Sequence, residues 1–250
     1  MGINMKSPTN RLVVLAILCL PAASANADFI GLNIGVSHWA PDLTGNFNSG
    51  NNASIDLKSD LGVNDPSQTS LVFILEHPIP LLPNVKYQNF NLETSGSNTL
   101  NRGIQFNGQS YTSGTQVTST FDFSHDDIVL YYEILDNWIN LDLGIDIKRF
   151  DGEVGIDGNN IKLEETVPLL YISARFDLPF TGFYAGADLN HLSSGDNSAN
   201  DSTLLVGYES SIGLGIEGGL KTFSLDLDNA DNIDTNIEYQ GLYLNGFFHF

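Results

Sequence analysis

The stretch Trp138–Phe150, WINLDLGIDIKRF, decides the fold. Its odd positions from 139 to 147 are all isoleucine or leucine, whereas its even positions from 140 to 148 are Asn, Asp, Gly, Asp and Lys. This period of two is typical of a β-strand, because successive side chains of a strand point to opposite faces. The alternation is also longer than most strands of soluble proteins. The stretch therefore predicts a long strand with one apolar face and one polar face.

Period-two alternation recurs along the chain and predicts ten strands. We place them near 28–39, 67–77, 84–94, 119–134, 138–150, 163–177, 182–192, 202–210, 213–227 and 236–250. Short connections alternate with longer polar ones, which cover 40–66, 95–118, 151–162, 193–201 and 228–235. This alternation of loop length is typical of a transmembrane β-barrel. We expect an all-β protein with a single antiparallel up-and-down barrel of about ten strands, or of eight if 202–227 forms one bent excursion.

A soluble secreted β-sandwich would also alternate apolar and polar residues. Strand length and the alternation of loops favour the barrel, and so do aromatic residues at the ends of the apolar faces. A barrel in lipid carries aromatic girdles at both interfaces. The candidates are Trp138, Phe176, Phe180 and Tyr208 near the short turns, and Trp39, Phe121 and Phe150 near the long loops.

The first 27 residues predict a secretory signal peptide. Lys6 and Arg11 precede the apolar run LVVLAILCLPAAS and small residues follow it, so we expect cleavage after Ala27 and a barrel domain over 28–250. A lipoprotein anchor at Cys19 is the alternative, which the large leucine before it disfavours. The net charge of −20 argues against nucleic-acid binding, and the 42% of hydrophobic residues argues against disorder.

Three segments of the chain resemble known outer-membrane proteins. EHPIPLLPNVK (Glu76–Lys86) and the glycine-spaced ADFIGLNIGVSHW (residues 27–39) resemble an uncharacterised family of small proteobacterial outer-membrane β-barrel proteins. Phe250, with Phe248 and other apolar residues at alternate positions before it, resembles the carboxyl-terminal signature read by the outer-membrane assembly machinery. The resemblance implies an exported protein of a Gram-negative outer membrane, in contact with its lipids, lipopolysaccharide and that machinery. It implies no cofactor and no catalytic residue, and we expect a monomer.

Charged residues on the polar faces of the predicted strands point toward the barrel interior. They are Glu76, Lys86, Glu133, Asp142, Asp146, Lys148 and Arg175. Barrels of about eight strands are already filled by side chains, so we expect these residues to pair in a network that fills the interior. The favoured function is a structural or interaction role with acidic surface loops. A narrow channel for small solutes is the alternative.

Two weaker patterns predict chemistry in the loops. Asp226, Asp228, Asp231 and Asp234 offer the oxygen ligands that Ca²⁺ or Mg²⁺ prefers, although the stretch lacks the glycine and terminal glutamate of a calcium loop. His191 and Ser193 fall on one strand face, as a base and a nucleophile must, and resemble the His-x-Ser pair of outer-membrane lipid A deacylases. No glutamate matches the third member of that set. We therefore expect no enzyme, with a lipid A-modifying hydrolase as the less favoured alternative.

Overall fold

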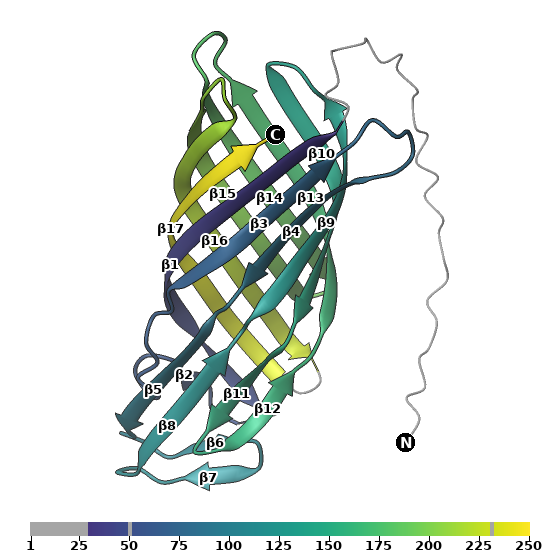
Figure 1. The fold of residues 1–250 in the computed structure, drawn as a ribbon. Helices are drawn as coiled ribbons and strands as arrows, with labels where there is room; N and C mark the ends of the chain where they lie inside the picture. The colour runs from purple at the N-terminus through teal and green to yellow at the C-terminus, as the bar shows by residue number, and fades with distance from the viewer. Residues whose placement is uncertain (1–29, 50–51, 231–232) are drawn as a thin grey trace, which may run out of the picture.

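Ten long antiparallel strands form a closed barrel (Figure 1). The structure, a computed structural model, describes residues 30–49, 52–230 and 233–250. The predicted signal peptide lies outside these ranges. Within them, no helix has the length and hydropathy needed to cross a membrane.

The barrel strands follow one another around the barrel in chain order. They are β1 (Gly31–Ser49), β3 (Gln68–Glu76), β4 (Asn84–Phe90), β9 (His125–Leu135), β10 (Ile139–Phe150), β13 (Thr166–Asp177), β14 (Phe183–Ser194), β15 (Asn197–Glu209), β16 (Leu214–Ala230) and β17 (Ile233–His249). Each strand pairs with the next, and β17 pairs back onto β1. The predicted ten-stranded antiparallel barrel is confirmed. The eight-stranded alternative is wrong, because 202–227 contributes to two full strands that pair with each other and with separate neighbours.

The pairing of β1 with β17 closes the barrel. Its register runs from Asn33 opposite His249 to Ser49 opposite Ile233. The backbone N–H of Phe250 extends this seam by donating to the Leu32 carbonyl at 2.8 Å. Over Gly31–Trp39, where β1 also pairs with β3, closure leaves β1 without a free edge, which is the condition for a β-structure to exist in lipid.

A second, smaller sheet extends four of the barrel strands beyond the end opposite the short turns (Figure 1). It contains β5 (Glu93–Thr99), β8 (Gln116–Asp122), β11 (Gly152–Ile156) and β12 (Asn159–Leu163), and it is joined by the short strand β2 (Ile55–Asp56) on β1 and the hairpin of β6 (Ile104–Phe106) and β7 (Gln109–Tyr111). We call this part, residues 52–66, 91–124 and 151–165, the head.

The long polar loops expected at this end are therefore largely wrong. Segments 95–118 and 151–162 are mostly strand, and β1 continues to Ser49. The connection expected over 193–201 is a tight turn, because Ser194 already pairs with Asn197. These segments are polar on one face only: their hidden apolar residues, such as Val117 and Ile156, are fully buried.

The polarity of the barrel inverts along its strands. Near the turns Ile34 and Val36 of β1 point outward and are exposed, while Ser37 points inward and is buried. Beyond that level the inward residues are apolar, beginning with Trp39 and Leu43, and the outward residues are polar. We call the two parts the turn half and the head half. The turn half is apolar outside and polar inside, and the head half is the reverse.

The inward apolar residues of the head half pack with the head into one core, which we call the plug. Its buried members are Trp39, Leu43, Phe47, Ile55, Leu57, Leu61, Val63, Phe90, Leu92, Leu100, Ile104, Phe106, Tyr111, Val117, Phe121, Phe123, Phe150, Ile156, Phe223, Ile237, Tyr239 and Tyr243. Edge-to-face contacts such as Trp39 on Phe90, with ring centroids 6.2 Å apart, fix its geometry.

The predicted girdle near the long loops is wrong. Trp39 and Phe121 are fully buried and Phe150 nearly so, since all three lie past the polarity inversion and point into the plug. The turn-end aromatics Trp138, Phe176, Phe180 and Tyr208 are exposed on the outer surface.

Candidate functional site

The turn half of the barrel encloses a polar cavity of about 360 Å³, which we call the lumen cavity. Inward residues of every barrel strand line it, from Lys221 beneath the plug to Glu76 and Asp136 beside the turns. Five of the seven predicted interior charges are among its lining residues, namely Glu76, Lys86, Glu133, Asp142 and Arg175. The cavity lies inside the barrel because the inward side of each strand in this half is polar.

Three of these five charged residues pair, each with a residue outside the predicted set. The Lys86 ammonium lies 3.0 Å from a carboxylate oxygen of Asp188. The Tyr131 hydroxyl donates to Glu76 at 2.8 Å. At the turn end the Arg175 guanidinium pairs with Asp177 at 2.8 Å and stacks over a tyrosine ring.

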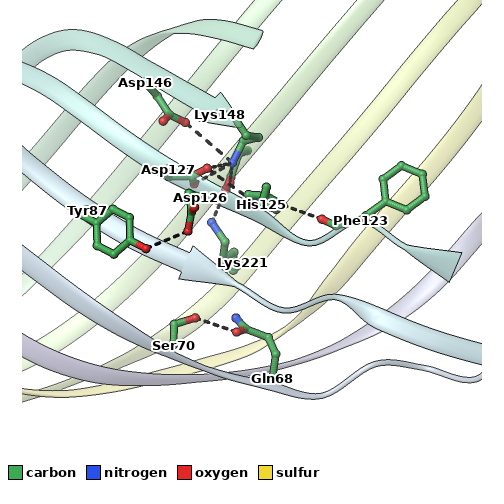
Figure 2. Close-up of polar contacts among 11 residues, drawn as sticks. Gln68, Ser70, Tyr87, Phe123, His125, Asp126, Asp127, Asp146, Lys148 and Lys221 are labelled. Carbon is green, nitrogen blue, oxygen red and sulfur yellow. Dashed lines mark hydrogen bonds and ion pairs between the residues drawn. The ribbon is translucent and has the colours of Figure 1, made fainter. Parts of the chain in front are cut away.

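Five buried ionisable residues form an ion layer between the lumen cavity and the plug. They are Asp127, Asp146, Lys148, Asp201 and Lys221, none more than 7% exposed. Lys148 donates to both carboxylate oxygens of Asp127 at 2.7 Å and to Asp201 at 3.2 Å. Lys221 donates to the other oxygen of Asp201. Figure 2 shows the two lysine side chains converging beside Asp127, and a dashed line joins Asp146 to Lys148.

The plug aromatics cover the side of the ion layer that faces the head. The Lys148 ammonium lies 5.4 Å from the centre of the Phe223 ring, and that of Lys221 lies 5.0 Å from the centre of Phe90. A buried charge needs compensation. Here carboxylates supply it on one side and ring faces supply it on the other.

Asp127 and Asp201 also group with His125 in an arrangement that metal ions use. Their ligand atoms and one from His125 lie within 4.8 Å of one another, the one such group of three within the described ranges. All four carboxylate oxygens, however, already contact a lysine ammonium. The lysines therefore occupy the place of a cation, and the group is an ion-pair cluster.

The predicted metal residues in the loops do not assemble in the structure. Asp226, Asp228 and Asp234 belong to no group of three metal-ligating side chains among the residues that the structure describes. Asp226 instead accepts a hydrogen bond from Asn236 at 3.2 Å. Asp231 lies outside the described residues.

The predicted hydrolase pair lies on the outer face of the barrel. His191 and Ser193 share the exposed face of β14. The His191 Nδ1 atom contacts the amide oxygen of Asn200 at 2.5 Å. Glu209 lies at the turn end and contacts His249 at 3.1 Å, so it does not orient His191.

Comparisons with known proteins assign no family to this chain. No family model matches the chain, and no curated protein matches it. Two solved structures are similar at 8% sequence identity: a Pseudomonas aeruginosa FadL homologue, with a TM-score of 0.37 over 88% of this chain and 90% of that one, and the Pseudomonas aeruginosa outer membrane protein OprG, with a TM-score of 0.28 over 88% and 95%. The resemblance to the uncharacterised outer-membrane family stays a prediction.

Sequence reasoning missed three members of the ion layer, Asp127, Asp201 and Lys221. Asp127 shares the parity of Glu133 in β9, so the same inward face could have revealed it. Asp201 was lost because the expected strand began at 202, whereas β15 begins at Asn197. The alternation of inward and outward positions along each strand was the usable signal. The misplaced start of β15 hid Asp201 from it.

Ion pairs also fix the head. Arg102 donates to Asp60 at 2.5 Å, and the Lys58 ammonium lies 2.5 Å from Asp65. Burial alone would raise the pKa of Asp60, but hydrogen bonds from Arg102 and from the Asp56 backbone outweigh it and hold that pKa below its usual value. These acids thus hold the segment after β1 in place, and they are not a free acidic surface.

Proposed function

We propose that this chain is an integral outer-membrane protein of a Gram-negative bacterium, with a structural or interaction role at the cell surface. The barrel is its membrane part and the head its surface part. Outer-membrane lipids and lipopolysaccharide are the expected neighbours. The observation that carries the proposal is the polarity inversion.

The exposed apolar side chains of the turn half form a belt suited to lipid. Leu71, Ile145, Leu204, Val206 and Leu242 are each more than half exposed. In water such a contiguous apolar surface is an interaction or aggregation site. In lipid it is the expected outer surface of a barrel.

The height of the belt fits a bilayer. Along β10 the outward apolar residues run from Ile139 to Ile147. That is roughly 26 Å along the strand at about 3.3 Å per residue. With a tilt of about 40° the height from Ile139 to Ile147 is roughly 20 Å. The apolar band on such barrels is about 25 Å tall, and the flanking Trp138 adds to the height of this belt.

The plug favours a closed barrel rather than a channel. Inward side chains of the head half and of segment 55–63 fill the interior with buried apolar groups. A solute that entered the lumen cavity would meet the ion layer and then the plug. The alternative of a narrow channel through the whole barrel therefore loses its main requirement.

The head supplies the surface for an interaction role. It is paired sheet held by a core, so its shape is fixed, and its exposed face carries acids including Glu93, Asp151 and Glu164. A rigid acidic face suits recognition of a basic partner or bridging by divalent ions.

Cell fractionation and bilayer recording test this proposal together. We expect the protein in the outer-membrane fraction, with a gel band that shifts between unheated and boiled samples. In a planar bilayer we expect no steady conductance. A protein recovered from the soluble fraction would contradict the membrane assignment, and a steady conductance on the nanosiemens scale would contradict the closed barrel.

A further inference from the structure

The connection between β3 and β4 carries large apolar side chains on its surface. We call residues 77–83, HPIPLLP, the proline turn. Ile79, Leu81 and Leu82 are 57%, 92% and 51% exposed. Leu81 also has a φ of 69°, in the left-handed region that bulky residues rarely adopt. The turn therefore holds a leucine in an unfavourable backbone conformation that presents its side chain to the surroundings.

The proline turn lies beside the outer wall of the barrel. The Leu81 carbonyl accepts a hydrogen bond from the Tyr132 hydroxyl at 2.8 Å. Tyr132 is an outward residue of β9, 46% exposed, and it is directly opposite Leu143, in the middle of the apolar belt on β10. The wall extends past this contact, because β9 continues to Leu135. In Figure 1 the connection between β3 and β4 leaves the barrel wall to the side. The turn is thus continuous with the belt.

The backbone N–H groups of the proline turn are largely satisfied within the protein. Three of its seven residues are prolines, which have no N–H group. The His77 N–H donates to the Asn84 side chain at 3.0 Å. The Leu82 N–H donates to the Ile79 carbonyl at 3.4 Å. Internal pairing of this kind is what lipid demands of a backbone, since lipid offers no hydrogen-bond partners.

The His77 ring joins the two ends of the proline turn. Its Nδ1 atom accepts a hydrogen bond from the Ile79 N–H at 3.2 Å, so its Nε2 atom carries the hydrogen. That Nε2–H group donates to the Pro83 carbonyl at 3.1 Å. Both ring nitrogens are therefore used inside the turn, and the apolar side chains are left as its outer surface.

We propose that the proline turn inserts into the bilayer, where Ile79, Leu81 and Leu82 contact lipid acyl chains just below the head groups. In water the exposed leucines would gain no burial. A protein partner that adds a strand is disfavoured, because a segment with three prolines lacks the N–H groups for pairing. The proposal rests on the proposed membrane location of the barrel and adds a lipid contact outside its wall.

Fluorescence quenching in phosphatidylcholine bilayer discs, whose two faces are both open to water, tests this contact. The refolded full-length chain has two tryptophans, and Trp138→Phe leaves only Trp39, which is buried in the plug, as background. In this background Leu81→Trp or Leu82→Trp places a reporter in the proline turn, and Leu204→Trp places one in the belt. The quenchers are phosphatidylcholine brominated near the head-group end of its acyl chains, and iodide in the water.

We expect brominated lipid to quench the fluorescence of both turn reporters by about half or more, because apolar groups inserted at an interface lie at the boundary of head groups and acyl chains. Iodide should quench them little. Quenching of Leu204→Trp by lipid, together with quenching of both turn reporters by iodide alone, would overturn the insertion and leave the membrane location intact. If brominated lipid quenches none of the three reporters, the membrane location itself fails.

A small side chain gives a second test that avoids a bulky reporter. Leu82→Cys in the same discs should react with a membrane-impermeant maleimide only after denaturation. Ser110→Cys, on the exposed surface of the head, should react in the folded state as well. The unaltered chain, with Cys19 in the predicted signal peptide, gives the background. The heat-modifiable gel band checks that each variant folds. Equal reaction rates of the two folded variants would place the proline turn in water and overturn the insertion.

Discussion

Ser37 and Trp39 are successive inward residues of β1, and the interior of the barrel changes from polar to apolar between them. The Ser37 hydroxyl accepts a hydrogen bond from Gln88 at 3.0 Å. The Trp39 ring packs on Phe90 and Tyr239, with centroids 6.2 and 6.3 Å away. Two strand residues advance about 7 Å, so the boundary between cavity and plug is one side chain deep.

Removing the largest side chain of the plug should destabilise the protein. Trp39 is fully buried, and truncating a buried aromatic residue to alanine typically costs about 3–5 kcal/mol. We expect Trp39→Ala to lower the free energy of unfolding by that amount, measured by guanidinium unfolding of the detergent-solubilised barrel. Trp138→Ala is the control: that side chain is 56% exposed at the turn end and should cost much less. Equal losses would show that the plug is loosely packed.

Removing one cation of the ion layer should also destabilise the protein. Lys148→Met leaves Asp127 without its ammonium and Asp201 with only one. Breaking a buried pair typically costs about 3–5 kcal/mol, because a buried charge is left uncompensated. Unfolding of Lys148→Met/Asp127→Leu should show partial recovery, and Lys162→Met, at an exposed pair, should show almost no change. A loss in the double variant larger than in Lys148→Met alone would argue against this account.

The Asp60–Arg102 pair should make the head sensitive to acid. The pKa of Asp60 is lower in the folded protein than its ordinary value of 3.8. Its contribution is complete above the unfolded pKa and is lost as the pH falls through the lowered folded pKa. We expect about 1 kcal/mol or less, since Arg102 is partly exposed. Hydrogen exchange of the amides of 56–62 should accelerate below pH 3.8, relative to the intrinsic rate.

A variant isolates this pair from other acid effects. Arg102→Gln should raise exchange of the same amides at neutral pH and reduce the additional loss in acid. Glu164→Gln, whose partner Lys162 is solvent-exposed, should change neither. An unaltered pH profile in Arg102→Gln would assign the acid sensitivity to another group.

Phe250 should matter for assembly more than other exposed aromatics at the turn end. Its N–H extends the seam to Leu32, and its ring meets Phe248 edge-on at 4.5 Å. We expect Phe250→Ser to reduce the yield of the heat-modifiable form in the outer-membrane fraction. Phe180→Ser, at a fully exposed turn position, is the control. Equal yields of the two variants would mean that the position of Phe250 on the seam is unimportant.

The sequence predicted the barrel because its signal is local. Each strand of the turn half alternates with period two, as in Ile139–Ile147, and ten such segments close in chain order. The inversion at Ser37 and Trp39 was not predicted, because alternation continues through it without a break. Parity says which residues share a face, but not which face meets lipid. Trp39, Phe121 and Phe150 were therefore assigned to the wrong side.

The interior site was predicted in part for the same reason. Inward parity selected Glu133 and Asp142, but which cation approaches which acid depends on stagger between strands distant in the sequence. Lys86 meets Asp188, 102 residues away. The buried side-chain oxygens of Asn190 and Asn245 accept no hydrogen bond from a described residue. This is a property of packing alone, with no trace in the local pattern.

The seam between β1 and β17 has a consequence for how the chain folds. It joins 17 residue pairs, one of them bridged by a hydrogen bond from Asp234 to Asn48 across 186 positions. Contacts of such long sequence separation form late, because the loop-closure entropy is lost before they form. β1 therefore keeps an unpaired edge until β17 has been synthesised and pairs with it. A chain interrupted anywhere before β17 would keep that edge open, which makes the seam a checkpoint for complete synthesis.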